Sequence, residues 1–96
     1  MKKFEIGNLY ITRGIQDIID SEPYFQVQIL ECLDRHIHND WGDLCKEDKQ
    51  ENEYSLIHGG RLLSAYEKLG LQKTYKIYII TEWDRSATTI LLPYEY

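Results

Sequence analysis

The residues best suited to chemistry are carboxylates and arginines that could meet at one end of a folded sheet. Clustered carboxylates can hold Mg²⁺ or act as general acid and base, and paired arginines can grip a phosphate. The candidate polar site comprises Asp40, Asp48, Asn52, Arg61, Glu82, Asp84 and Arg85. The same side chains could instead form a salt-bridged network that fixes a turn against a helix, and we favour this structural interpretation. No nucleophile–base motif, glycine-rich phosphate loop or zinc-ligand spacing accompanies them, so we assign no catalytic residue and prefer a non-enzymatic role.

Histidine and cysteine do not form a recognisable metal motif. His36 and His38 lie two residues apart, so on a helix they point about 200° away from each other and cannot share one ion. Cys32 falls on an apolar helical stripe and is expected to be a small core residue rather than a nucleophile. We therefore expect no metal and no cofactor.

Acidic residues concentrate between Asp40 and Glu53, where Lys46 and Lys49 are the only basic residues. A solvated helix face is the simplest interpretation, and a contact surface for another protein is the alternative. The candidate contact residues are Trp41, Asp43, Glu47, Glu51 and Glu53. Trp41 could also anchor its turn in the core, which is the interpretation we favour for that residue. The net charge of -5 makes direct binding of nucleic acid an unlikely role.

Length and composition indicate one folded domain over residues 1–96. The chain has 96 residues, of which 43% are hydrophobic, and this content is too high for intrinsic disorder. No apolar run approaches the ~18–20 residues of a membrane span, and the N-terminus lacks the apolar core of a signal peptide. We therefore expect no membrane association and a cytoplasmic location, in which Cys32 and Cys45 remain thiols.

The C-terminal third predicts a β-hairpin. Two segments rich in β-branched and aromatic residues, within 75–93, flank Asp84 and Arg85. A strand over Arg61–Tyr66 precedes them, and residues 4–11 could add a fourth strand. The expected fold is α+β: an antiparallel β-meander of three to four strands packed on two to three helices on one face.

Three helices are expected upstream and between these strands. Thr12 is a suitable N-cap for a short first helix. Ser21 as cap and Pro23 in the first turn would begin a second helix, whose apolar stripe runs from Phe25 to Ile37. A third helix should extend over residues 44–58 and end at Gly59-Gly60.

Several segments together resemble a family of small bacterial proteins carried on plasmids, phages and other mobile elements. The matching segments are Phe4-x-x-Gly7, Thr12-x-Gly14, residues 40–44, Glu47-Asp48 with Asn52, residues 60–66, and residues 80–93 with Tyr96. Arg13 departs from the proline of that family. Members are labelled plasmid-related or restriction–modification subunits, but a chain this short without methyl-transfer motifs cannot be a methyltransferase. The resemblance implies a mobile-element setting and carries over no catalytic residue.

The leading hypothesis is a small acidic binding module from a mobile genetic element. Its partner would be a host or plasmid protein, such as a restriction or CRISPR defence component. One alternative is a small metal- or phosphate-binding hydrolase that uses the clustered carboxylates and arginines. The other alternative is a dimeric structural protein.

Overall fold

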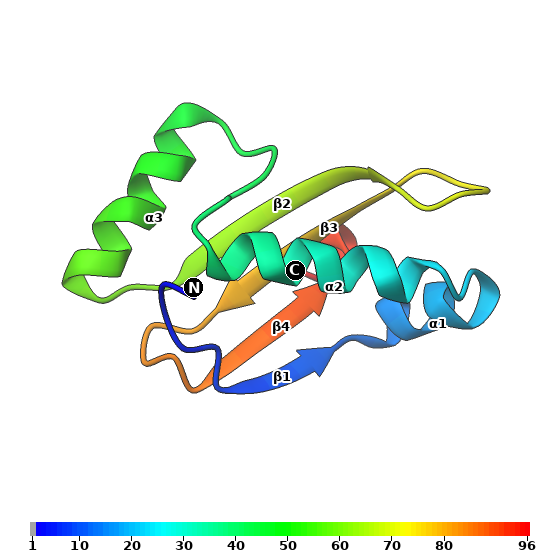
Figure 1. Ribbon diagram of the computed structural model, residues 1–96, viewed down its shortest axis with the longest axis horizontal. Coiled ribbons are helices and arrows are strands. Elements are labelled where there is room, and N and C mark those ends of the chain that lie inside the picture. Colours follow the sequence, from blue (N-terminus) through cyan, green and yellow to red (C-terminus); the bar gives the residue numbers. More distant parts are fainter. Residues whose placement is uncertain (1) are drawn as a thin grey trace.

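The sheet has the strand order β1-β4-β3-β2 and is mixed, because β1 runs parallel to β4 while the other pairs are antiparallel (Figure 1). The computed structural model describes residues 2–96. Within them the elements are β1 (Asn8–Ile11), α1 (Arg13–Ser21), α2 (Phe25–Ile37), α3 (Lys46–His58), β2 (Leu62–Leu69), β3 (Tyr75–Thr81), β4 (Ala87–Leu91) and a short 3-10 turn, η1 (Pro93–Glu95). The α+β fold and the β2-β3-β4 meander are confirmed.

The predicted hairpin is formed by β3 and β4. Ile79 pairs with Ile90 and Thr81 with Thr88, so the turn falls at Glu82–Ser86 as expected. Strand β2 runs farther than its predicted end at Tyr66, because a bulge between Tyr66 and Leu69 lets pairing with β3 resume at Tyr75.

The N-terminal segment adds the fourth strand, beginning at Asn8 rather than at Phe4. Gly7 has φ +62°, and a Cβ there would overlap the backbone of Ser86. The chain therefore passes close to the β3–β4 turn before β1 joins β4, with Asn8 opposite Ala87.

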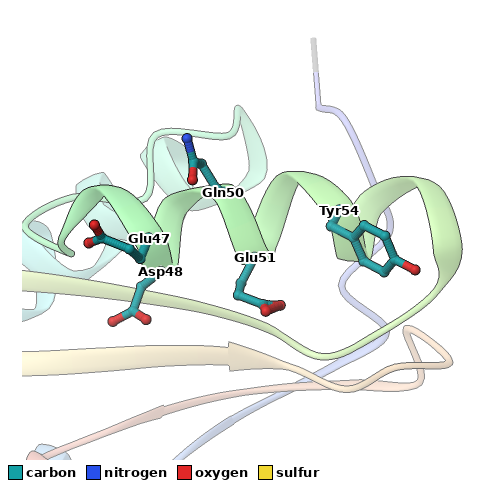
Figure 2. A pocket seen from close by; sticks show the side chains of 5 residues that line it. All are labelled: Glu47, Asp48, Gln50, Glu51 and Tyr54. Atoms are coloured by element: carbon teal, nitrogen blue, oxygen red, sulfur yellow. The ribbon is translucent and has the colours of Figure 1, made fainter.

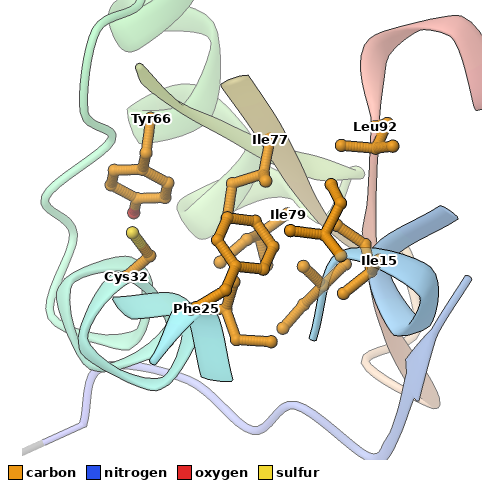
Figure 3. Packing of buried hydrophobic residues seen from close by; sticks show 10 residues of the cluster. Ile15, Phe25, Cys32, Tyr66, Ile77, Ile79 and Leu92 are labelled. Carbon is orange, nitrogen blue, oxygen red and sulfur yellow. The ribbon is translucent and has the colours of Figure 1, made fainter. Parts of the chain in front are cut away.

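Helix α2 lies across one face of the sheet, with α1 at its N-terminal end (Figure 1). Their apolar residues meet the sheet in one buried cluster (Figure 3). Its members are Ile15, Ile18, Phe25, Ile29, Cys32, Tyr66, Ile77, Ile79, Ile90 and Leu92. Burial raises the pKa of the Cys32 thiol to about 11, which agrees with its expected role in the core.

The helix boundaries agree with the sequence in two places and differ in two. Helix α3 begins at Lys46, with Cys45 as its N-cap, rather than at residue 44. Thr12 caps α1, since its Oγ1 accepts from the Ile15 amide at 3.4 Å. Gly59 ends α3 with φ +78°. The predicted start of α2 is wrong, because Ser21 is the last residue of α1 and Pro23 lies in the turn between the helices. The Ser21 hydroxyl donates to the Ile18 carbonyl instead of capping α2.

Candidate functional site

Helix α3 is fastened to the edge of β2 by one buried side chain. Asn52 donates from Nδ2 to the Leu63 carbonyl at 2.7 Å and accepts from the Leu63 amide at 3.1 Å. These are the bonds that a neighbouring strand would make, so the side-chain amide takes the place of a strand at this position. Asn52 is the only buried residue of α3, and its amide is fully used in holding the helix.

The turn that precedes α3 closes the next part of the same edge. The Ala65 amide donates to the Trp41 carbonyl at 3.3 Å, and the Asp43 amide donates to the Ala65 carbonyl at 2.7 Å. The Asp43 carboxylate then accepts from the Glu67 amide at 2.8 Å. The backbone and the carboxylate of Asp43, a candidate contact residue, therefore hydrogen-bond the open backbone groups of the β2 edge.

Trp41 anchors this turn in the core, as favoured from the sequence. Its side chain is 4% exposed, its ring lies against Phe4 and His36, and its Nε1 donates to Glu53 Oε2 at 2.6 Å. The inclusion of Trp41 among the contact candidates is wrong, because a partner cannot reach a buried ring. Glu53 is also engaged, since it satisfies the indole N–H.

The tip of the β3–β4 hairpin does reach α3, at the C-terminal end of the helix. Arg85 donates to the carbonyls of Ser55 and Gly60 at 3.2 and 2.6 Å, and to those of Glu82 and Trp83 in its own turn. Unpaired carbonyls and the helix dipole make this end of α3 favourable for a cation. Arg85 has φ +60°, which costs about 1 kcal/mol for a residue with a Cβ, and these bonds hold it there. The Arg85 guanidinium therefore binds backbone carbonyls of α3, of Gly60 and of its own turn.

The side chains of the other polar candidates make their hydrogen bonds to groups outside the candidate set. Asp40 receives two bonds from Arg35, at 2.7 and 3.1 Å, and these lower the pKa of Asp40. Asp84 Oδ1 accepts from the Ser86 amide within its own turn. Arg61 donates to the Tyr96 hydroxyl. None of these hydrogen bonds joins a carboxylate to a second candidate residue.

A small hollow of ≈ 200 Å³ between α3 and β2 takes in two members of the predicted polar set, Asp48 and Asn52, and no arginine. Glu82 enters the site only through its backbone carbonyl, which binds Arg85. Within residues 2–96, no three His, Cys, Asp or Glu side chains are grouped so as to hold a metal ion. The convergence that the hydrolase hypothesis requires is not present in this geometry.

Glu47, Asp48 and Glu51 of α3 are exposed to solvent, and Asp48 and Glu51 also border the small hollow against β2. Glu47, Asp48, Gln50, Glu51 and Tyr54 line an open hollow of ≈ 570 Å³ along the helix, with Asp48 and Glu51 projecting from the same side (Figure 2). In the described part of the chain, Glu47, Asp48 and Glu51 have no ion-pair partner. Glu47 and Asp48 also lie in the first turn, where the helix dipole stabilises negative charge.

A buried polar network that we did not predict lies behind this site. His36 Nδ1 is 2.5 Å from Ser64 Oγ, and His36 Nε2 is 2.9 Å from Thr81 Oγ1. Thr81 Oγ1 is 2.7 Å from Thr88 Oγ1, which donates to the Ile6 carbonyl at 2.8 Å. The network joins α2, three strands and the segment before β1. The one sequence signal was a histidine on the apolar stripe of α2.

The carbonyl at the end of this network fixes the direction of every proton in it. A carbonyl can only accept, so Thr88 donates to Ile6 and must accept from Thr81. Thr81 in turn accepts from Nε2–H of His36, and in a neutral ring Nδ1 then accepts from Ser64. A neutral His36 is therefore protonated on Nε2.

The surroundings of His36 agree with a neutral ring. Its side chain is 0% exposed and lies against Phe4 and Trp41. Burial, assisted by the positive charge of Arg85, lowers the pKa of His36 to about 3. Ser64 beside it is also 0% exposed, so this serine–histidine pair is closed to any substrate and serves to connect the sheet to α2.

The fold and these contacts define a small α+β protein with a helix fastened along a sheet edge and an acidic face turned outward. Comparisons with protein-family models, with curated proteins and with solved structures give no match for this chain. No helix in residues 2–96 combines the length and the apolar character needed to cross a membrane.

Proposed function

We propose that this protein is a non-enzymatic binding module that docks the acidic face of α3 on a basic surface of another protein. The observation that carries the proposal is the contrast between the side chains that hold α3 and those that remain exposed on it. Asn52, and Arg85 at the helix end, fix the helix to the sheet. The exposed carboxylates of Glu47, Asp48 and Glu51 have no ion-pair partner within residues 2–96. A rigid helix with unpaired charge favours rapid and oriented association with a surface of opposite charge.

Apolar side chains continue this face toward the end of the helix. Tyr54 is 61% exposed and stacks on His58 at 3.9 Å between ring centroids, and Ile57 is 80% exposed. An exposed tyrosine next to carboxylates is a common anchor at protein interfaces, since it combines a large apolar area with a hydroxyl. The expected contact surface therefore consists of Glu47, Asp48, Glu51, Tyr54 and Ile57.

The resemblance to mobile-element proteins suggests the kind of partner. A restriction or CRISPR nuclease of the host presents basic grooves that bind nucleic acid, and an acidic helix can occupy such a groove by charge complementarity. The net charge of -5 favours a protein partner over direct contact with DNA or RNA. The proposed location is the cytoplasm, where Cys32 and Cys45 would remain the free thiols that they are in this structure.

The test compares two triple variants with equal changes in charge. The α3 variant carries Glu47→Lys, Asp48→Lys and Glu51→Lys. The control variant carries three exposed substitutions elsewhere: Asp17→Lys, Asp20→Lys and Glu31→Lys. Glu53 is left unchanged in both, because its loss would unpair the buried indole of Trp41.

Each variant is used as bait in a lysate of a bacterial host, and retained proteins are quantified by mass spectrometry at low and high salt. We expect a partner that wild type and the control variant retain, that the α3 variant loses by at least about tenfold, and that high salt releases. Identical partner profiles for wild type and the α3 variant would contradict the proposal.

A further inference from the structure

The two edges of the sheet differ in how their backbone groups are satisfied. The β2 edge is closed by Asn52 and by the turn at 41–43, as described above. Strand β1 lies at the other edge, and among the strands of residues 2–96 it pairs with β4 alone. An open edge is a template for pairing with another strand.

The open groups belong to alternate residues of β1. The amides of Asn8 and Thr12 donate to carbonyls on the β4 side, at 3.0 and 3.1 Å. Because backbone groups alternate along a strand, the amides and carbonyls of Leu9 and Ile11 point away from β4. Within the described residues, no hydrogen bond satisfies them.

The side chains of β1 make this edge apolar. Leu9, Tyr10 and Ile11 are 43%, 51% and 38% exposed, and no charged residue or proline occurs between Asn8 and Thr12. Sheet edges of soluble proteins are usually protected by lysine, proline or a bulge, and β1 has none of these. The outer edge of β1 therefore has the exposed apolar side chains and the open backbone groups that allow another strand to pair with it.

The flank of α2 above this edge is apolar as well. Gln28 and Arg35 mark the flank of α2 that faces β2, since Gln28 bonds the Gly70 amide and Arg35 lies over the Tyr66 ring. Helical spacing places two apolar residues on the opposite flank, toward β1: Leu33 and Ile37. The apolar surface at the β1 edge thus extends from the sheet layer to the helix layer.

We propose that β1 pairs antiparallel with β1 of a second copy of this chain, about a twofold axis at Tyr10. In this register Leu9 lies opposite Ile11 of the partner subunit, and each amide donates to the carbonyl facing it. All the outward groups of Leu9 and Ile11 are then satisfied in both chains. Tyr10 faces its own counterpart as a non-hydrogen-bonded pair, in which aromatic side chains contact each other closely.

Two observations favour a second copy over a strand from another protein. The pattern of open groups is self-complementary, so the chain itself supplies a matching strand in the correct register. The charge distribution also permits it, because α3 lies beyond the opposite edge of the sheet. With strands about 4.8 Å apart, the two acidic helices are separated by well over the ~8–10 Å screening length. This inference is independent of the function proposed for α3.

Sedimentation velocity from about 10 µM to about 1 mM tests the dimer, because a short edge should associate in the micromolar range. We expect wild type to shift from the mass of one chain to twice that mass. Leu9→Lys, which puts a charge on the proposed interface, should remain monomeric over the same range. The matched control is Leu71→Lys, at an exposed leucine in the β2–β3 loop, and it should associate as wild type does. A monomeric wild type at the highest concentration, or equal association of Leu9→Lys, would overturn the proposal.

Cross-linking tests the register and does not depend on the folding of Leu9→Lys. In a Cys45→Ser background, Tyr10→Cys places the two introduced thiols opposite each other, within the 4.4–6.8 Å Cα separation that disulfides accept. Asn8→Cys is the control, because in this register its thiols lie roughly 13 Å apart. With oxidised glutathione as oxidant, we expect a covalent dimer from Tyr10→Cys and little from Asn8→Cys. Equal yields from both variants would refute the register.

Discussion

Mild acid should destabilise this protein through His36. The ring ordinarily has a pKa of 6.5, and burial against Phe4 and Trp41 lowers the pKa of His36 to about 3 in the folded state. Between these two pH values the unfolded chain binds more protons than the folded chain. The stabilisation is therefore complete above pH 6.5 and is lost as the pH falls toward 3.

The magnitude follows from the size of the pKa shift. Each pH unit inside the window costs about 1.4 kcal/mol, so the free energy of unfolding should drop by about 2 kcal/mol between pH 7 and pH 5. This range lies above the titration of Asp40 and Asp84, because hydrogen bonds from Arg35 and Ser86 lower the pKa values of these carboxyls from 3.8. Their loss of stabilising charge begins at lower pH.

The assay is urea unfolding at pH 7, 6 and 5, followed by the fluorescence of Trp41, which lies beside His36. Wild type is compared with His36→Gln, which removes the titrating ring, and with His58→Gln, the same change at an exposed position. We expect wild type and His58→Gln to lose about 2 kcal/mol from pH 7 to pH 5. His36→Gln should begin less stable and stay nearly constant.

Two results would refute the reasoning. One is an equal loss of stability in wild type and His36→Gln over the same pH range. The other applies even if His36→Gln does not fold: nitrogen chemical shifts of the wild-type ring at pH 5 would show both ring nitrogens protonated. Burial lowers the pKa of His36 to about 3, so we instead expect a neutral ring at pH 5, with its proton on Nε2 toward Thr81.

Two further substitutions test how the β2 edge is closed. Asn52→Ala removes both hydrogen bonds to the β2 backbone and should lower the free energy of unfolding by about 2 kcal/mol in the same urea assay. The control Gln50→Ala, at an exposed position of α3, should change the free energy of unfolding by less than about 0.5 kcal/mol. Equal effects of the two substitutions would contradict the role of Asn52 at the sheet edge. Gly42→Ala forces a Cβ onto the Ala65 carbonyl at φ +75° and should cost more than about 2 kcal/mol, measured as a fall in thermal midpoint. Gly59→Ala has a similar φ of +78° but meets no atom within 4 Å, so it should cost only about 1 kcal/mol, and a larger cost than at Gly42 would contradict the argument.

Local patterns in the sequence were sufficient for much of the fold. The dense β-branched residues around Asp84 and Arg85 predicted the hairpin, and the apolar spacing from Phe25 to Ile37 predicted α2. The parallel pairing of β1 with β4 was beyond such reasoning, because it joins segments at opposite ends of the sequence and leaves no local periodic signal. The start of α2 was misplaced because Ser21 and Pro23 suit the end of one helix as well as the start of the next.

The candidate site was predicted less well, and for a physical reason. Sequence identifies which groups can ionise or donate, but not which backbone groups need a partner. Asn52 and Asp43 are used at the edge of β2, and Arg85 at the end of α3, because the chain leaves amides or carbonyls open at those places. The hydroxyls of Thr81 and Thr88 were overlooked because threonine is common in strands, and only their contact with His36 distinguishes them.

The parallel pairing of β1 with β4 also governs when this protein can complete its fold during synthesis. The Thr88 hydroxyl binds the Ile6 carbonyl, 82 residues away, so β1 has to wait until β4 has been synthesised. Until then the nascent chain leaves β1 without the strand that pairs with it in the fold. A chaperone that binds short apolar segments would meet β1 at this stage, before β4 is available to pair with it.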